Sequence, residues 1–276
     1  MVRIRIRVDE RRRGEGGDPL RRRGGSRPLG LVHRSGRLAD VSQPPEHAAE
    51  PRQRWRLVVA RDPDAPQATQ RDVAATWVAA LDDAHLPLMS AEGTRGRSRV
   101  SFAAPLPVGM TAEHELIDVV LTERLPVGQV RDALVDRLPS GWRLIDLFDV
   151  WLAGPPLAGR VVAADYRIEL ADEPDPDGLR QAAADLLAAD RIARERQKGG
   201  TTVTYDLRPL LMSISVVDGS PLVIRTRTRF DQERGTGRPE EVIGALGNRI
   251  GTPLAIRRIV RERVLLDEDV SDGRLD

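Results

Sequence analysis

The alternation of hydrophobic and polar positions predicts a strand near residue 54, where Trp55, Leu57 and Val59 share one face. The other predicted elements follow in this order: a helix over 70–85, two strands and a proline-bounded loop over 101–121, a helix over 127–138 and a strand over 142–151. The order is strand, helix, strand, strand, helix, strand.

The same order recurs in the second half of the chain. Its predicted elements are a strand over 164–170, a helix over 179–192, a strand over 203–207 that could continue through 210–217, a strand over 222–230, a helix from 239 and a strand within 254–266. A repeated βαββαβ order predicts an α+β fold of two tandem ferredoxin-like domains. Each has an antiparallel sheet with two helices on one face. The predicted domains are residues 51–154 and 160–268, joined by Gly154-Pro155-Pro156 and followed by a polar tail over 269–276.

The first 50 residues have no sustained helical or strand period after Val8. They hold 12 Arg against 7 acidic residues, a balance of +5, whereas the remainder holds 31 basic against 35 acidic residues, a balance of −4. This composition predicts a disordered basic arm over 1–50. Two interpretations stay open: a tether for RNA or an acidic partner, or a solvated coding extension without a function.

The stretch from Ser101 to Leu121 is the least generic part of the sequence. Pro105 and Pro107 forbid a helix across the loop, and Gly109 supplies a permissive backbone position after it. The following strand alternates hydrophobic residues with Asp118 and Val120 and is therefore predicted to be half-buried.

Composition excludes several classes of protein chemistry. Cysteine is absent from the chain, which excludes disulfides, thiolate metal sites, iron–sulfur clusters and a cysteine nucleophile. No hydrophobic run approaches the roughly 20 residues of a membrane span, and the start lacks an apolar signal core. We therefore expect a cytoplasmic protein with no membrane partner.

Several stretches resemble the uncharacterised radical SAM-linked protein family, whose members look like modules fused to, or encoded beside, cobalamin-binding radical SAM proteins. The stretches that carry the resemblance are 54–57, 92–93, 99–109, 115–121, 205–209 and 237–242. The chain departs from the family pattern at Gln70-Arg71-Asp72-Val73 and at Thr94-Arg95-Gly96-Arg97, where the family usually shows other polar residues. The resemblance implies an accessory to a radical SAM partner, because the chain lacks the cysteines that such an enzyme needs for its own cluster.

Two groups of arginines are candidate phosphate contacts. Arg95, Arg97 and Arg99 alternate with small residues in a loop that offers guanidinium, hydroxyl and backbone N–H groups. A solvated loop without a ligand is an equally good interpretation.

The second group consists of Arg225, Arg227 and Arg229, which alternate along one strand and so project from one face. Arg257 and Arg261, with Arg258 and Arg263, could add to this face from the last strand. Ferredoxin-like sheets leave one face free of helices, and RNA-recognition folds use such a face. Against this, residues 160–268 hold 18 basic and 18 acidic residues, so local salt bridges could neutralise the stripe.

No catalytic motif or cofactor site emerges from the sequence. The four histidines are scattered, the carboxylate pairs lack the spacing of a calcium loop, and no glycine-rich phosphate loop is present. We therefore expect a non-catalytic accessory or binding module without cofactor or metal. It would present RNA, such as tRNA, to a radical SAM enzyme, or dock with that enzyme. The alternatives are a metal-independent RNA-processing enzyme with His85 or His114 as base, and a protein–protein scaffold held at its sheet edges.

Overall fold

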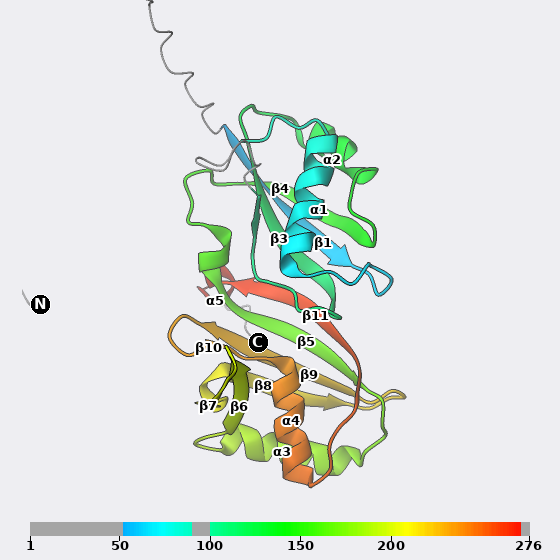
Figure 1. The fold of residues 1–276 in the computed structure, drawn as a ribbon, viewed down its shortest axis with the longest axis vertical. Helices are drawn as coiled ribbons and strands as arrows, with labels where there is room; N and C mark the ends of the chain where they lie inside the picture. Colours follow the sequence, from blue (N-terminus) through cyan, green and yellow to red (C-terminus); the bar gives the residue numbers. More distant parts are fainter. Residues whose placement is uncertain (1–51, 90–99, 272–276) are drawn as a thin grey trace, which may run out of the picture. The chain divides into compact units, whose positions relative to one another are not determined.

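The computed structural model describes residues 52–89 and 100–271 (Figure 1). The predicted arm over 1–50 and the loop arginines Arg95, Arg97 and Arg99 lie outside the described residues.

In the N-terminal half, residues 52–150, the described elements follow the predicted order. They are β1 (Gln53–Arg61), α1 (Gln70–Asp83), β2 (Val100–Phe102), β3 (Thr111–Leu121), α2 (Val127–Val135) and β4 (Trp142–Val150). Helix α1 begins at a capping box, in which the Thr69 hydroxyl accepts from the Asp72 backbone N–H and the Asp72 carboxylate accepts from the Thr69 backbone N–H.

The C-terminal half, residues 157–271, contains more elements than the sequence predicted. They are a 3-10 turn (Leu157–Arg160), β5 (Val161–Leu170), α3 (Pro176–Ala188), β6 (Ala193–Lys198), β7 (Thr201–Asp206), a 3-10 turn (Arg208–Leu210), β8 (Leu211–Val217), β9 (Val223–Asp231), β10 (Gly235–Thr236), α4 (Pro239–Ile250), β11 (Ile256–Leu266) and α5 (Asp267–Ser271). Ile192 is buried but lies beyond the end of α3, and α5 takes up the start of the predicted polar tail.

One large sheet runs through both halves. Its strand order is β10-β9-β5-β11-β3-β1-β4, with β2 paired to β3 and β8 paired to β9, while β6 and β7 form a separate hairpin. All the neighbouring pairs are antiparallel except β11 and β3, which run parallel where Val260 lies beside Thr111 and Arg261 beside Ala112. The protein is therefore a mixed α+β fold built on a mostly antiparallel sheet.

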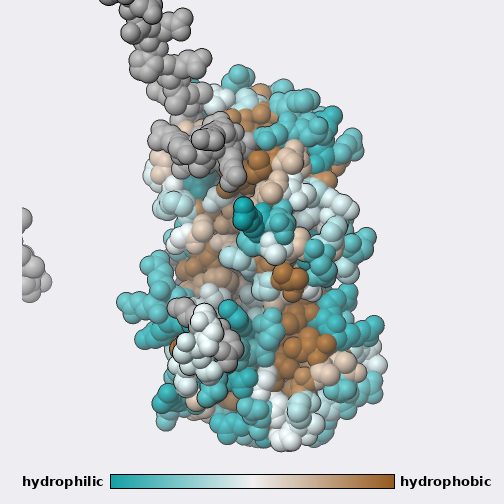
Figure 2. Space-filling view, in the orientation of Figure 1, coloured by the Kyte–Doolittle hydropathy of each residue, from teal (hydrophilic) through white to brown (hydrophobic). Residues whose placement is uncertain are grey.

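Two hydrophobic cores lie against the helices. In the N-terminal half, Trp55, Leu57 and Val59 face Trp77 and other core residues of α1 and α2, which confirms the predicted buried face of the first strand. In the C-terminal half, α3 and α4 pack on β5, β8 and β9. Figure 2 shows that hydrophobic surface gathers in the middle of this view, with hydrophilic residues along both sides. None of the helices in the described ranges is both long and apolar enough to cross a membrane.

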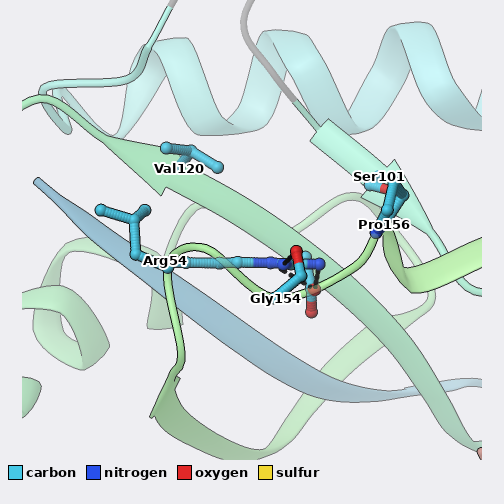
Figure 3. A pocket seen from close by; sticks show the side chains of 7 residues that line it. Arg54, Ser101, Val120, Gly154 and Pro156 are labelled. Carbon is cyan, nitrogen blue, oxygen red and sulfur yellow. Dashed lines mark hydrogen bonds and ion pairs between the residues drawn. The ribbon is translucent and has the colours of Figure 1, made fainter. Parts of the chain in front are cut away.

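The opposite face of the N-terminal half carries a buried group of charges. Asp118, which the sequence placed on a solvated strand face, is 2% exposed. Its carboxylate accepts hydrogen bonds from Arg54 and Arg56 at 2.8 Å each. Arg54 also donates to the carbonyl oxygens of Gly154 and Pro155, so the predicted linker is held over this face (Figure 3). The strand is covered on both faces, which is why the half-buried prediction was wrong.

Replacing Asp118 with Asn should lower the free energy of unfolding by about 3–5 kcal/mol, because the buried guanidinium groups of Arg54 and Arg56 lose the carboxylate that they share. Urea unfolding of the full chain measures this. Asp132→Asn, at an exposed position of α2, is the matched control and should change the free energy by no more than about 0.5 kcal/mol. If the two substitutions lowered the free energy of unfolding equally, the buried ion pairs of Asp118 would not stabilise the fold as we expect.

Candidate functional site

The structure places the predicted arginines of the last strands on two different faces. Arg225, Arg227 and Arg229 lie on β9, with their side chains on the side of the sheet opposite α3 and α4, because Ile224, Thr226 and Thr228 are buried toward the helices. Arg257 is exposed near the start of β11, and Arg261 is fully buried farther along that strand.

The pairing of β5 with its two neighbouring strands, β9 and β11, places a carboxylate between two arginines. Asp165 on β5 lies opposite Arg227, and Arg263 on β11 lies on the other side of Asp165. The two guanidinium groups each donate to the Asp165 carboxylate at 2.6 Å. Burial alone would raise the pKa of Asp165, but hydrogen bonds and charge from Arg227 and Arg263 outweigh it, so the pKa lies below its ordinary value.

Two further carboxylates on this face are also shared between pairs of arginines. Glu169 accepts from Arg167 at 3.3 Å and from Arg258 at 2.5 Å. Glu262 accepts from Arg167 at 3.1 Å and from Arg225 at 3.3 Å. Each acid therefore orients two guanidinium groups.

Arginines outnumber acids on this surface, which we call the arginine face. We define it by the side chains of Arg167, Arg225, Arg227, Arg229, Arg258 and Arg263. The acids that contact it are Glu113, Asp165, Glu169 and Glu262. Asp231 lies two residues beyond Arg229 on the same face of β9, so five acids stand against six arginines and leave a local balance of +1.

The arginine face keeps donors available to solvent in spite of its ion pairs. The Arg225 side chain is 56% exposed, and the side chains of Arg258 and Arg263 are 40% and 43% exposed. Arg229 is exposed, and its side chain makes no hydrogen bond or ion pair within the described residues. Ser213 and Ser215 lie opposite Arg227 and Arg225 on β8 and add exposed hydroxyl groups.

The aromatic residues of these strands lie on the other side of the sheet. Tyr166 is buried in the helix-side core, and Phe230 packs against that core. Among the described residues of β5, β8, β9 and β11, the arginine face therefore offers no ring for base stacking. It can contact phosphate oxygens, but it lacks the stacking platform of RNA-recognition sheets.

Arg261 turns away from the arginine face because of a β-bulge. The register between β11 and β5 shifts between Arg261 and Arg263, so the two side chains lie on opposite sides of the sheet. Arg261 is 1% exposed and donates to Glu115 of β3 at 2.6 and 2.5 Å. It also donates to the carbonyl oxygens of Pro105 and Ala104, at 3.0 and 3.2 Å, and so holds the proline-bounded loop.

Beside Arg261 the structure has a cavity of about 490 Å³, which we call the proline-loop cavity. It lies between the loop that carries Pro105 and Pro107 and the beginning of α4. The residues that line it are Pro105, Pro107, Tyr166, Phe230, Thr236, Gly237, Arg238, Pro239, Glu240, Glu241 and Arg261. Sequence reasoning singled out the proline loop and residues 237–242 separately, but it had no signal that these stretches meet.

A smaller cavity, of about 200 Å³, lies on the far face of the N-terminal half (Figure 3). Its polar wall consists of Arg54 and Asp118, which are bonded to each other, and its rim includes Ser101, Gly154 and Pro156. The charged groups here are already paired, so this space offers little to a charged ligand.

The histidines of the catalytic alternative are not brought together with other titratable groups in a catalytic arrangement. His114 lies in β3, where its Nδ1 atom is 3.0 Å from the backbone oxygen of Glu262. His85 is exposed just after α1. Within the described ranges, no group of three or more histidine and carboxylate side chains is arranged to hold a metal ion.

A family model described as "Uncharacterized protein conserved in bacteria (DUF2344)" matches residues 54–239, which is more than half of the chain. The chain belongs to this family. The description of DUF2344 names neither a radical SAM protein nor another partner. A search of curated proteins gave no match for this DUF2344 protein.

Solved structures provide weak likenesses. A chain of a Cbf5-Nop10-Gar1 complex has a TM-score of 0.41 and 12% identity, with 75% of this chain and 49% of that chain covered. A chain of an archaeal box H/ACA sRNP Nop10-Cbf5 complex has a TM-score of 0.38 and 14% identity, with 81% and 50% covered. The DUF2344 chain spans about half the length of these solved chains.

The ion pairs of Asp165 should make stability depend on pH in the acid range. Because its folded pKa is lowered, Asp165 contributes stability that is present above the unfolded pKa of about 3.9 and is lost as the pH falls through the folded pKa. Asp165→Asn should therefore reduce the free energy of unfolding at pH 7 more than at pH 3. Urea unfolding at both pH values measures this, and an equal loss at the two would contradict it.

Proposed function

We propose that this DUF2344 protein is a non-catalytic module that binds RNA through phosphate contacts on the arginine face. The observation that carries the proposal is the sharing of each central carboxylate, Asp165, Glu169 or Glu262, between two arginines. Such sharing holds the guanidinium groups in a fixed orientation. Because one carboxylate serves two arginines, the arginine face still has more positive than negative charges.

The physical argument for a phosphate ligand rests on orientation and charge. A guanidinium group donates in a planar fork that matches the oxygens of a phosphate. The carboxylates hold one side of Arg225, Arg258 and Arg263, and their exposed sides can still donate. Less side-chain entropy is then lost on binding than with free arginines.

The same features predict binding with little sequence preference. Phosphate contacts position a protein on a nucleic acid, whereas contacts to base edges specify its sequence. The arginine face has no described aromatic side chain for stacking, although Ser213 and Ser215 could accept from or donate to a ribose hydroxyl. A structured RNA such as tRNA, which presents several phosphates to one surface, fits this face better than an isolated base does.

The two-domain organisation belongs to this proposal as well. In the N-terminal half the strand order is β4-β1-β3-β2, and in the C-terminal half it is β11-β5-β9-β8. These orders support the interpretation of residues 51–154 and 160–268 as two ferredoxin-like domains, whose sheets join between β3 and β11. On this interpretation the arginine face is the helix-free face of the second domain. A radical SAM enzyme as protein partner remains an expectation from the resemblance alone.

Replacing Arg225 and Arg229 together with Gln should weaken tRNA binding by the full-length chain about tenfold or more at low salt, because two phosphate contacts are lost. The slope of log K against log salt should become shallower by about 1.4–1.8, at 0.7–0.9 for each contact. Filter binding or fluorescence anisotropy at several salt concentrations measures both quantities.

Two controls separate the arginine face from other basic groups. Arg191→Gln with Arg249→Gln removes two exposed arginines from other places in the C-terminal half and should leave the slope unchanged. Replacing Arg11–Arg13 and Arg21–Arg23 with Gln tests the arm. If only the arm variant lost binding, the arginine face would not be the RNA contact and the proposal would fail.

A further inference from the structure

Four charged residues line the proline-loop cavity. The side chains of two of them form ion pairs with other residues of the protein, and the side chains of the other two do not. Arg261 is bonded to Glu115, and Glu241 accepts from Arg194 at 2.8 Å. Arg238 and Glu240 are exposed, and the side chain of neither makes a hydrogen bond or ion pair within the described residues. The rim of the cavity thus has one uncommitted positive charge and one uncommitted negative charge.

The interior of the cavity contains a hydroxyl group whose proton has no acceptor. Tyr166 is 3% exposed, and its hydroxyl lies beside the Arg261 guanidinium, which can only donate. No acceptor for the Tyr166 proton is found in the part of the chain that the structure describes. Burial raises the pKa of Tyr166, so the hydroxyl keeps this proton at neutral pH. Tyr166 lines the cavity, so a ligand or water bound there can accept this proton.

The remaining walls are apolar and suit a flat ring. Pro105 and Pro107 contribute rigid aliphatic rings from one side, and Phe230 contributes an aromatic ring from β9. Aromatic and heteroaromatic rings bind well against such surfaces, since offset stacking adds to the burial of apolar area. The volume of about 490 Å³ lies within the range of pockets that hold small ligands.

We propose that the proline-loop cavity binds a nucleoside monophosphate, either free or as an unstacked residue of an RNA chain. The base lies against Phe230 and the two prolines, and one of its carbonyl or ring-nitrogen acceptors takes the proton of Tyr166. Glu240 accepts from an N–H group of the base or a hydroxyl of the ribose, and Arg238 binds the phosphate. Ligands without one of these three parts leave a cavity group unpaired.

This site is separate from the arginine face and does not depend on it. Tyr166 and Phe230 lie on the helix side of the sheet, whereas the side chains of the arginine face lie on the opposite side. A substitution that abolishes RNA binding by the arginine face therefore leaves nucleotide binding by the proline-loop cavity measurable, and the reverse also holds.

Isothermal titration calorimetry of the full-length chain with AMP, GMP, CMP and UMP tests the proposal. The corresponding nucleosides and inorganic phosphate serve as partial ligands. At least one monophosphate should bind, and Tyr166→Phe and Arg238→Gln should each weaken it about tenfold or more. Arg238→Gln should bring the monophosphate close to the affinity of its nucleoside. Arg249→Gln, at the exposed far end of α4, is the matched control and should bind within about twofold of the unchanged protein.

The source of the nucleotide is decided by a second titration with a short unstructured RNA. If no free monophosphate binds but Tyr166→Phe and Arg238→Gln weaken the RNA about tenfold, the cavity takes a residue of a polymer. If neither substitution weakens any of these ligands, the proposal is overturned. Arg238 is exposed, so its variant remains informative even if Tyr166→Phe disturbs the fold. The Arg225→Gln, Arg229→Gln protein should bind the monophosphate normally, which separates this test from that of the arginine face.

Discussion

The buried ion pair between Arg261 and Glu115 is the interaction on which the joint between the two halves depends. It connects β11 to β3 in the first half, where only two residue pairs form the parallel contact. Charges buried to this extent are tolerated only when paired and fully hydrogen-bonded. Arg261 meets this condition by donating to two loop carbonyls as well as to Glu115. One side chain therefore positions the strand pairing, the proline loop and the wall of a cavity together.

Much of the fold follows from local sequence patterns, and the clearest case is β1. The alternation of Trp55, Leu57 and Val59 identifies both the strand and its buried face, because a period of two residues needs no tertiary information. The β6–β7 hairpin was only half predicted. Ala193–Lys198 is dominated by charged residues and lacks an alternating hydrophobic face, so propensity gave no reason to place a strand there.

The candidate site was harder to predict because bulges and long-range pairing decide it. The arginine stripe on β9 follows from alternation alone, but the strand that supplies its acids could not be identified without the register of β5 and β11. Arg261 and Arg263 have the spacing of residues on one face, yet a bulge sends them to opposite sides of the sheet. Asp118 illustrates the same limit, since nothing near it in sequence indicates that Gly154 and Pro155 cover its face.

The place of β11 in the sheet also has a consequence for the order of events during synthesis. This strand lies between β5 and β3, yet it comes after all the other described strands in the sequence. While the ribosome is still adding the residues before Ile256, Glu115 has no Arg261 beside it and the proline loop lacks the donor that later holds its carbonyls. The pairs of β1 with β3 and β4, and the hydrophobic core beneath them, consist of residues from the first half alone. These contacts can therefore form before β11 is synthesised. The joint, together with the cavity wall that Arg261 provides, can be completed only after β11 has been synthesised.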